Sequence, residues 1–170
     1  DSTPLVRPRK EETSGYPSQI DRYHVVGEIA RGGFGVILRA RDLDLGREVA
    51  LKVLAEKYAR DPEMTTRFLE EAQIGGQLQH PGIVPIHEIG TYDGDRPYLA
   101  MKLVRGQTLG ELLESRAGPD KERQRFVSIF AQVCQTLAYA HSRGVIHRDL
   151  KPSNVMIGTF GEVQVMDWGL

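Results

Sequence analysis

Residues 147–154 bring together more kinds of reactive side chain than an ordinary loop requires. Their sequence is HRDLKPSN. Asp149 could bind a hydroxyl group, Lys151 could contact a phosphate, and Asn154 could bind a metal ion. Asp167 follows further along the chain, and the oxygens of Asp and Asn suit Mg²⁺, which prefers oxygen ligands and phosphates. The segment therefore indicates phosphate and metal chemistry, although a merely polar loop is the alternative interpretation when it is taken alone.

A glycine-rich turn, Gly32-Gly33-Phe34-Gly35, lies between two predicted strands. Without Cβ atoms, such a turn can bring backbone N–H groups close to phosphate oxygens. An ordinary glycine-rich hairpin remains the alternative. Because the order is strand–turn–strand, and not strand–turn–helix, the turn does not fit a dinucleotide-binding fingerprint or a Walker-type loop.

Lys52 ends the sequence VALK at residues 49–52, on the third predicted strand. A lysine within a strand usually faces solvent, and that is the simplest interpretation here. This strand, however, follows the glycine turn, so its ammonium group could reach phosphates held beneath that turn. Glu71, on the next predicted helix, is a candidate partner for the ammonium group. Glu70 points about 100° away around the same helix.

The elements that must position these groups follow from hydrophobic periodicity and turn residues. Strands are predicted over 23–29, 36–41, 47–54, 83–90 and 96–104, and helices over 62–78, 109–115 and 121–143. Asp61 and Pro62 form a helix start, and Asp93-Gly94-Asp95 a hairpin turn. Strands and one helix thus precede helices and short hairpins. This order predicts an α+β protein with a small sheet-based lobe followed by a helical lobe.

The predicted helix over 121–143 carries one apolar stripe, because its apolar residues recur at spacings of three and four. The residues of the stripe are Phe126, Ile129, Phe130, Val133, Leu137 and Ala140. Gly144 fits the position just after the helix end.

Composition narrows the class of protein. The 170 residues are 40% hydrophobic and 26% charged, with a net charge of -1, which gives no indication of nucleic acid or an anionic membrane as a partner. The single cysteine, Cys134, excludes an internal disulfide and fits a reducing compartment. No membrane-spanning run or signal peptide is visible, so we expect a cytoplasmic location. Residues 1–22 are expected to form a flexible leader.

Taken in order, these motifs resemble those of the eukaryotic-like (Hanks-type) protein kinases. The glycine loop, VALK, the helix glutamate, HRDLKPSN and Asp-Trp-Gly occur with the family's order and spacing over residues 23–170. LKPSN resembles the serine/threonine branch, and Asp-Trp-Gly together with HPGIVP at 80–85 resembles bacterial members. The resemblance implies a five-stranded antiparallel N-lobe with one helix and a hinge over 23–104. The first part of a helical C-lobe would follow over 105–170.

The resemblance also implies that ATP and Mg²⁺ bind between these lobes. Lys52, held by Glu71, would contact the α- and β-phosphates. Around the phosphates and the base would lie Ala30, Gly32, Gly33, Phe34, Gly35, Ile37, Ala50, Met101, Lys102, Val104 and Met156. Met101 would be the gatekeeper, with the backbone of Lys102 and Val104 as the hinge.

The remaining implied roles belong to the two polar segments. Asp149 would accept the proton of a Ser or Thr hydroxyl on a protein substrate, and Lys151 would steady the γ-phosphate. Asn154 and Asp167 would hold Mg²⁺. Arg148 resembles the residue that meets an activating phosphate in one subclass of the family.

Three features depart from the family pattern. Ala30 replaces the first loop glycine, which is expected to stiffen the flap but to be tolerated. Gly75 replaces a larger apolar residue, so a weakened contact with Trp168 is expected, with the indole partly filling the gap. The chain also stops one residue after Asp-Trp-Gly. We therefore expect it to be part of a longer protein, with sensor or membrane domains possible beyond Leu170. Alone, it should expose apolar surface and phosphorylate no protein detectably.

Two other classes of function compete with a protein kinase. The first is a pseudokinase or truncated remnant that binds nucleotide without catalysis, which Gly75, Ala30 and the missing part of the C-lobe would favour. The presence of all five expected polar groups argues against it; they are Lys52, Glu71, Asp149, Asn154 and Asp167. The second is a small-molecule kinase of related fold, which LKPSN disfavours.

Overall fold

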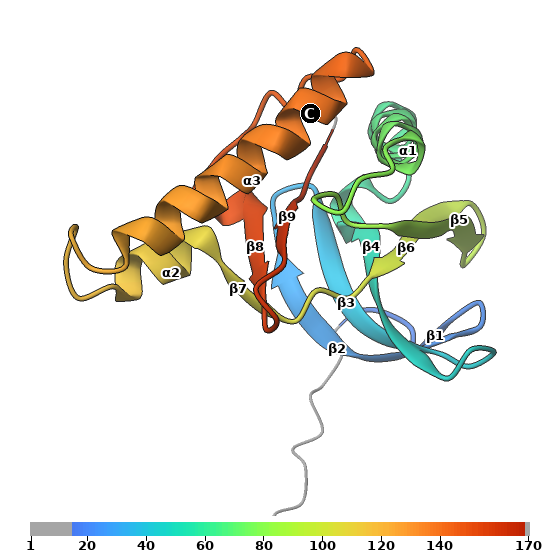
Figure 1. The fold of residues 1–170 in the computed structure, drawn as a ribbon. Coiled ribbons are helices and arrows are strands. Elements are labelled where there is room, and N and C mark those ends of the chain that lie inside the picture. Colours follow the sequence, from blue (N-terminus) through green and yellow to red (C-terminus); the bar gives the residue numbers. More distant parts are fainter. Residues whose placement is uncertain (1–14, 169–170) are drawn as a thin grey trace, which may run out of the picture.

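The computed structural model describes residues 15–168, which form two lobes (Figure 1). The first lobe is a curled sheet with one long helix against it. The second contains two helices and a small three-stranded sheet. This is the α+β arrangement that the order of predicted elements indicates. Within these residues, no helix is both long and apolar enough to cross a membrane.

The first lobe is built on six antiparallel strands in the order β1-β2-β3-β4-β6-β5. They are β1 (Gln19–Ile20), β2 (Tyr23–Arg31), β3 (Gly35–Asp42), β4 (Arg47–Leu54), β5 (Ile86–Tyr92) and β6 (Arg96–Lys102). The five expected strands are present, and β1 adds a sixth at the edge. The predicted hairpin turn is confirmed: Asp93 and Gly94 have φ angles of 46° and 90°.

The structure corrects the end of the predicted leader. Within residues 1–22, the first fourteen lie outside the described part of the chain, but residues 15–22 belong to the lobe. Ile20 is fully buried, and Tyr16 packs against the core of the sheet. The N–H of Val25 also donates to the carbonyl of Ser18 at 2.9 Å. Polar composition hid this strand, because its pairing with β2 places only one apolar side chain, Ile20, in the core.

Alternation along the strands separates a core face from a site face. Val36 and Leu38 on β3, with Leu51 and Val53 on β4, are buried in one cluster inside the curl. The residues between them point to the opposite face. Ile37 pairs with Lys52 across β3 and β4 there. A strand that is apolar on both faces can thus present one lysine to the space beside the sheet.

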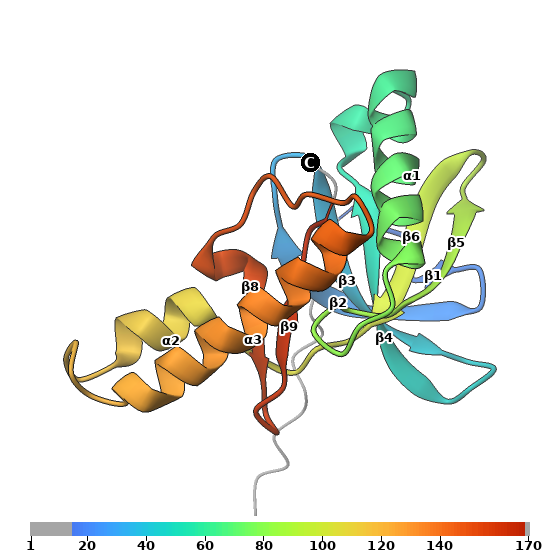
Figure 2. The same cartoon turned by 45° about the horizontal axis from the view of Figure 1, so that its top comes forward.

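Helix α1 (Pro62–Gln77) packs on this second face, as Figure 2 shows. The side chain of Asp61 accepts hydrogen bonds from the N–H groups of Glu63 and Met64, so the predicted N-cap is confirmed. Phe68 and Ala72 are buried against Leu54 and Leu99 of the sheet. A short 3-10 helix, η1 (Glu56–Tyr58), joins β4 to α1.

The second lobe contains α2 (Leu109–Ser115), α3 (Arg123–Ser142), η2 (Pro152–Asn154) and the antiparallel sheet β7 (Gly106–Thr108), β8 (Val155–Gly158) and β9 (Val163–Val165). Strand β7 was not predicted, because three residues carry no periodic signal. A Cβ on Gly106 would lie 2.0 Å from the carbonyl oxygen of Ile157. Only glycine therefore allows β7 to approach β8 this closely.

Helix α3 buries most of its predicted stripe, but Phe130 does not belong to it. Ile129, Val133 and Ala140 are buried, whereas the side chain of Phe130 is 68% exposed. Thr136, which the predicted stripe does not include, is buried. A step of one residue turns the helix by about 100°, so Phe130 leaves the face on which Ile129 lies.

The connection between α1 and β5 contacts the second lobe at two elements, α3 and β9. The ring of His80 stacks on Tyr139 of α3 with centroids 5.1 Å apart, and the N–H of Gln79 donates to the Tyr139 hydroxyl. The carbonyl of Gly82 accepts from the N–H of Val165 at 2.7 Å. The end of α1 is therefore tied to the strand that leads into Asp167.

Candidate active site

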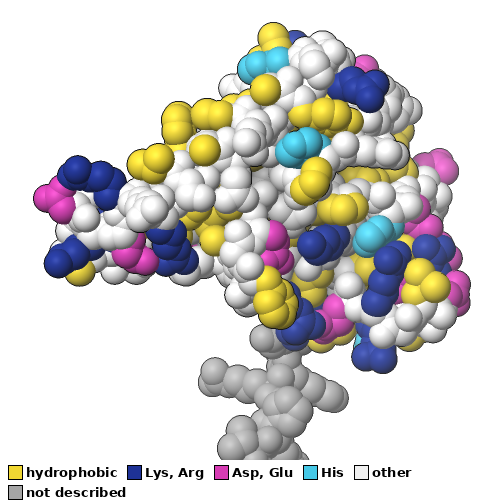
Figure 3. All heavy atoms as spheres, in the orientation of Figure 1, with side chains coloured by type: hydrophobic (Ala, Val, Ile, Leu, Met, Phe, Trp, Pro, Cys, Tyr) yellow, Lys and Arg dark blue, Asp and Glu magenta, His cyan; other side chains and the backbone are white. Residues whose placement is uncertain are grey.

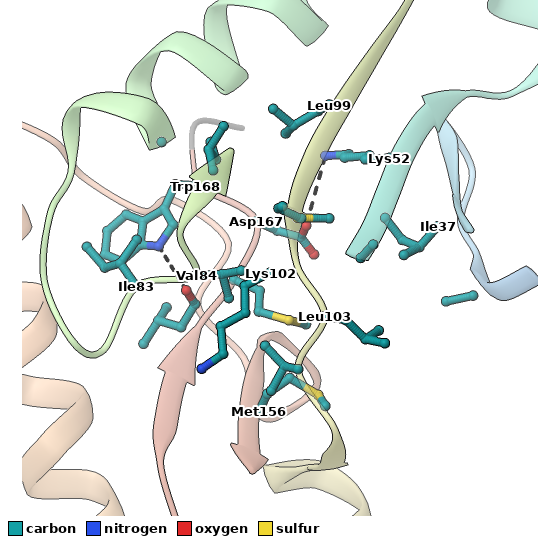
Figure 4. A pocket seen from close by; sticks show the side chains of 18 of the residues that line it. Ile37, Lys52, Ile83, Val84, Leu99, Lys102, Leu103, Met156, Asp167 and Trp168 are labelled. Carbon is teal, nitrogen blue, oxygen red and sulfur yellow. Dashed lines mark hydrogen bonds and ion pairs between the residues drawn. The ribbon is translucent and has the colours of Figure 1, made fainter. Parts of the chain in front are cut away.

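A cavity of about 470 Å³ opens between the two lobes. Figure 4 shows Lys52 and Asp167 at one end of it, and Met156 toward the other. Ten residues predicted for the site line it: Ala30, Ile37, Ala50, Lys52, Glu71, Met101, Lys102, Val104, Met156 and Asp167. The middle is mostly apolar and its ends are polar, which suits a flat apolar group that carries polar substituents.

The predicted pairing of Lys52 with Glu71 is confirmed. The ammonium nitrogen of Lys52 lies 3.1 Å from Oε2 of Glu71 and 3.9 Å from Oδ1 of Asp167. Glu71 reaches it because α1 packs on the site face of β4, and its side chain is only 17% exposed. Two carboxylates thus surround one ammonium group at the polar end of the cavity.

The predicted polar loop forms a compact hydrogen-bonded group beside Asp167. Oδ2 of Asp149 accepts from the Lys151 ammonium at 2.7 Å and from the Asn154 amide nitrogen at 3.2 Å. These contacts, that of Lys151 above all, hold the pKa of the Asp149 carboxyl below its ordinary value. Asp149 is therefore ionised at neutral pH and can accept a hydroxyl hydrogen.

A buried histidine joins this loop to the segment that follows β9. His147 is 2% exposed, and the N–H of Asp149 donates to its Nδ1. Nε2 must then carry the hydrogen, and it lies 2.6 Å from the carbonyl oxygen of Met166. The ring also packs on Trp168 at 4.8 Å. The sequence contained this histidine within its polar motif, but only its neighbours reveal its positioning role.

Two site residues hold left-handed backbone conformations. Arg148 has a φ of 69° and Asp167 a φ of 57°. Residues other than glycine rarely adopt such φ angles, and these conformations persist where surrounding contacts require them. The backbone bond from the N–H of Met166 to the carbonyl of Asn154, at 2.8 Å, is one such contact. It places the segment before Asp167 directly beside the polar loop.

The glycine turn connects two residues that line the cavity, Ala30 and Ile37. Ala30 belongs to β2 and has no positive φ, so alanine fits this position without backbone strain, in agreement with the expectation that it is tolerated. Gly35 does need to be glycine, because a Cβ there would lie 2.8 Å from the carbonyl oxygen of Val53. Gly32, Gly33, Phe34 and Gly35 do not line the cavity itself.

The space beside Gly75 is filled differently from the expectation. A Cβ on Gly75 would lie 2.8 Å from Cδ1 of Ile86, and no atom of the Trp168 indole lies within 4 Å of that point. Ile86 of β5, and not the indole, therefore occupies the gap. The indole instead donates from Nε1 to the carbonyl of Val165 at 3.0 Å. The isoleucine reaches the glycine because β5 runs beside α1.

Three polar residues at the other end of the cavity were missed: Thr108, Glu111 and Ser153. Thr108 and Glu111 form a capping box at the start of α2, in which Glu111 accepts from the Thr108 N–H at 2.7 Å. These hydrogen bonds keep the pKa of the Glu111 carboxyl below its ordinary value. The spacing of threonine and glutamate signals a capping box in the sequence, but not its place at the cavity.

Comparison with known proteins decides the family. Residues 23–170 match the protein kinase domain. The chain belongs to the protein kinase family. The family assignment makes residues 147–154 the candidate catalytic loop and residues 32–35, the glycine flap, a candidate nucleotide-binding turn. The curated relatives include serine/threonine-protein kinase PknD of Protochlamydia amoebophila, 38% identical over 172 residues, which cover 95% of this chain and 17% of that protein.

Other relatives agree with this assignment. PknD of Chlamydia muridarum is 42% identical over 159 residues, covering 88% of this kinase chain and 17% of that protein. The crystal structure of the Mycobacterium tuberculosis PknI kinase domain matches with a TM-score of 0.73 at 29% identity, over 89% of this chain and 61% of that one. The expected resemblance to bacterial Hanks-type kinases is confirmed. This kinase chain spans about a sixth of the length of the PknD proteins.

Proposed function

We propose that this protein is a serine/threonine protein kinase, which transfers the γ-phosphoryl group of ATP to hydroxyl groups of protein substrates. The observation that carries the proposal is the joining of two polar groups at one end of the cavity. Lys52 lies between Glu71 and Asp167 there. The N–H of Met166, next to Asp167, donates to the carbonyl of Asn154, which belongs to the loop that carries Asp149. The names of the PknD relatives point to the same activity.

The apolar part of the cavity fits the adenine base. Ala50 and Met156 line it from opposite lobes, and Met101 lines it from β6. The N–H of Lys102 already donates to the carbonyl of Pro85, so Lys102 can offer the base only its carbonyl group. The N–H of Val104 supplies a donor in this proposal. Thr108 and Glu111 would then accept hydrogen bonds from ribose hydroxyl groups.

The polar end fits phosphates and Mg²⁺. The Asn154 amide nitrogen donates to the backbone carbonyl of Asp149 at 2.9 Å. Its amide oxygen has no hydrogen-bond donor among residues 15–168 and is thus available as a ligand. Together with the Asp167 carboxylate it offers two oxygen ligands, which suit a cation bound mainly through phosphates. When bound, Mg²⁺ would neutralise charge on the transferring phosphoryl group.

The side chains of this kinase can then carry out the transfer. Asp149 binds the Ser or Thr hydroxyl and accepts its proton as the oxygen attacks the γ-phosphorus. The bond from that phosphorus to the β–γ bridging oxygen breaks, and ADP leaves with its electron pair. The ammonium group of Lys151 lies 2.7 Å from the Asp149 carboxylate, and in this proposal it contacts the γ-phosphate.

The test is the variant Asp149→Asn in the full-length gene product. Transfer of labelled γ-phosphate to a generic protein substrate should fall by about 10²–10⁴-fold, because the proton acceptor is lost. Binding of ATP with Mg²⁺, measured by calorimetry, should change little. Asp120→Asn, on an 80% exposed carboxylate in the α2–α3 connection, is the matched control and should keep both properties.

The result also separates the kinase from a nucleotide-binding module without catalysis. Such a module would bind ATP and transfer no phosphate in either form. Unaltered transfer by Asp149→Asn would contradict the proposed role of the carboxylate. Phosphoamino acid analysis of the product then distinguishes Ser and Thr from Tyr as the acceptor.

A further inference from the structure

The tip of the glycine flap is in contact with the connection between β4 and α1. The rings of Phe34 and Tyr58 have centroids 5.6 Å apart and planes inclined by 31°. Phe34 is otherwise an exposed phenylalanine, with 55% of its surface accessible. Tyr58 ends the short helix η1 and is half-buried. In Figure 2 the turn after β2 and the connection that precedes α1 lie side by side.

The backbone of the flap is fastened at the same place. The N–H of Ala55 donates to the carbonyl of Phe34 at 2.9 Å, and the N–H of Gly32 donates to the carbonyl of Gly35 at 2.9 Å. Gly35 approaches Val53 so closely that it leaves no room for a Cβ. The tip is thus held by one backbone bond and one aromatic contact to the same connection.

Tyr58 is itself well placed to act as an anchor. Its N–H donates to the carbonyl of Ala55 at 2.8 Å, and its carbonyl accepts from the N–H of Asp61 at 3.0 Å. The ammonium nitrogen of Lys57 lies 4.7 Å from the centroid of the Tyr58 ring. Asp61 is the N-cap of α1, the helix that carries Glu71. The aromatic contact therefore links the flap to the element that positions the Lys52 ammonium group.

In this anchored conformation the base of the flap already covers the cavity. Ile29, Ala30 and Ile37 line it together with Ala50 on β4. A flap held here loses less conformational freedom when a nucleotide binds than a flap that moves freely.

We propose that Tyr58 is a positioning residue for nucleotide binding, which holds the glycine flap over the cavity through the ring of Phe34. Tyr58 does not line the cavity and acts only through the flap. This inference rests on the proposed function, since it assumes that ATP is the ligand. Its effect belongs to nucleotide affinity, and the chemical step at Asp149 should be unaffected.

The test compares Tyr58→Ala and Tyr58→Phe in the full-length gene product, with the affinity for ATP and Mg²⁺ measured by calorimetry. We expect Tyr58→Ala to bind roughly three- to tenfold more weakly, the range that one aromatic contact can supply. The KM for ATP should rise by a similar factor while kcat stays nearly constant. Tyr58→Phe keeps the ring and should restore wild-type affinity.

Phe34→Ala provides the second variant, because its exposed side chain contributes little to folding. It should weaken binding to the same extent as Tyr58→Ala, and the double variant should show no additional loss. Phe160→Ala is the matched control: it removes a phenylalanine that is 96% exposed on the β8–β9 turn, and it should bind ATP as the wild type does.

Wild-type affinity in both Tyr58→Ala and Phe34→Ala would overturn the inference and leave the proposed function intact. A wild-type protein that binds no ATP would overturn the proposed function, and this inference with it. A loss in Tyr58→Ala that Tyr58→Phe fails to restore would also overturn it, because the ring would then not be the anchor.

Discussion

At the scale of single residues, the ion pair between Lys52 and Glu71 shows how a site depends on one contact between distant residues. A lysine on a strand and a glutamate on a helix are ordinary surface residues in most proteins. Here their side chains are 23% and 17% exposed and their charged atoms are 3.1 Å apart. Partial burial makes this pair stronger than a surface ion pair, because less water screens it.

Glu71→Gln should therefore impair catalysis. We expect kcat/KM for phosphoryl transfer to fall roughly ten- to a hundredfold, since hydrogen bonds to charged groups contribute about 1.5–3 kcal/mol. Steady-state kinetics at saturating protein substrate measures the change. Glu70→Gln alters the neighbouring, exposed glutamate on α1 and should leave kcat/KM unchanged. Equal losses in the two variants would contradict the role of the Lys52–Glu71 pair.

Asp42 is the buried carboxylate of the first lobe, with no exposed surface. Burial opposes its ionisation, but two backbone N–H groups, from Leu45 and Asp44, donate to it. The guanidinium groups of Arg22 and Arg47 lie 3.5 and 3.6 Å away. The pKa of Asp42 is consequently lowered, and the ionised form stabilises the fold.

Asp42→Asn should lower the free energy of unfolding at pH 7 by about 1–3 kcal/mol. Because the folded-state pKa of Asp42 is lowered, its contribution is fully present above the unfolded-state pKa. It is lost as the pH falls through the folded-state value. The difference between variant and wild type in urea denaturation should therefore shrink below about pH 4. Asp44→Asn, at a 73% exposed carboxylate, is the matched control and should change the free energy of unfolding at pH 7 little.

At the scale of elements, the connection between α1 and β5 packs directly against α3. A Cβ on Gly82 would lie 1.8 Å from the hydroxyl oxygen of Thr136 and 3.0 Å from its Cβ. Thr136 is buried on α3, and its hydroxyl donates to the carbonyl of Gln132. The glycine is therefore required because the connection and α3 touch directly. The backbone φ angle of Gly82 is not the reason for the glycine.

Gly82→Ala should separate this connection from α3 and destabilise the protein by about 1–3 kcal/mol. Thr136→Ala removes the hydroxyl and methyl groups that the new Cβ would strike. The double variant should consequently be more stable than the sum of the two single changes predicts, by about 0.5–3 kcal/mol. Thermal unfolding of the four proteins measures this coupling. Strict additivity would show that the added methyl group does not collide with Thr136.

At the scale of the whole molecule, the outer face of α3 exposes large apolar side chains. Val127 is 60% exposed and Phe130 68% exposed, one helical turn apart. Figure 3 shows apolar side chains along the visible length of this helix. A contiguous apolar face of this kind favours association with other protein surfaces. The exposure of apolar surface expected from the sequence is thus found on α3.

Phe130→Lys should reduce self-association of the 170-residue polypeptide. Light scattering over a range of concentrations should show a lower mean mass than the wild type has, because a charge interrupts the apolar face. Phe160→Lys adds the same charge at an isolated, 96% exposed phenylalanine and serves as the control. An equal reduction in both variants would assign the effect to net charge, and not to the α3 face.

Much of this protein was determined by local signals that the sequence contains by itself. Alternation placed β2, β3, β4 and β6, and an N-cap with proline placed the start of α1. The polar loop, the glycine turn and the lysine of β4 were each visible as residue types at fixed spacing. These features are local, since each depends on neighbours within a few residues, and so a sequence displays them directly.

Tertiary structure decided what depends on contacts between distant segments. Strand β1 is held by its partner β2, and β7 by its close approach to β8. Ile86 fills the space beside Gly75, and Phe130 faces outward while Thr136 is buried. No periodicity encodes these outcomes, because each follows from how two elements pack. The chain thus specified its candidate catalytic groups locally, and they were brought together by the packing of α1 on the sheet and by the backbone bonds of Val165 and Met166.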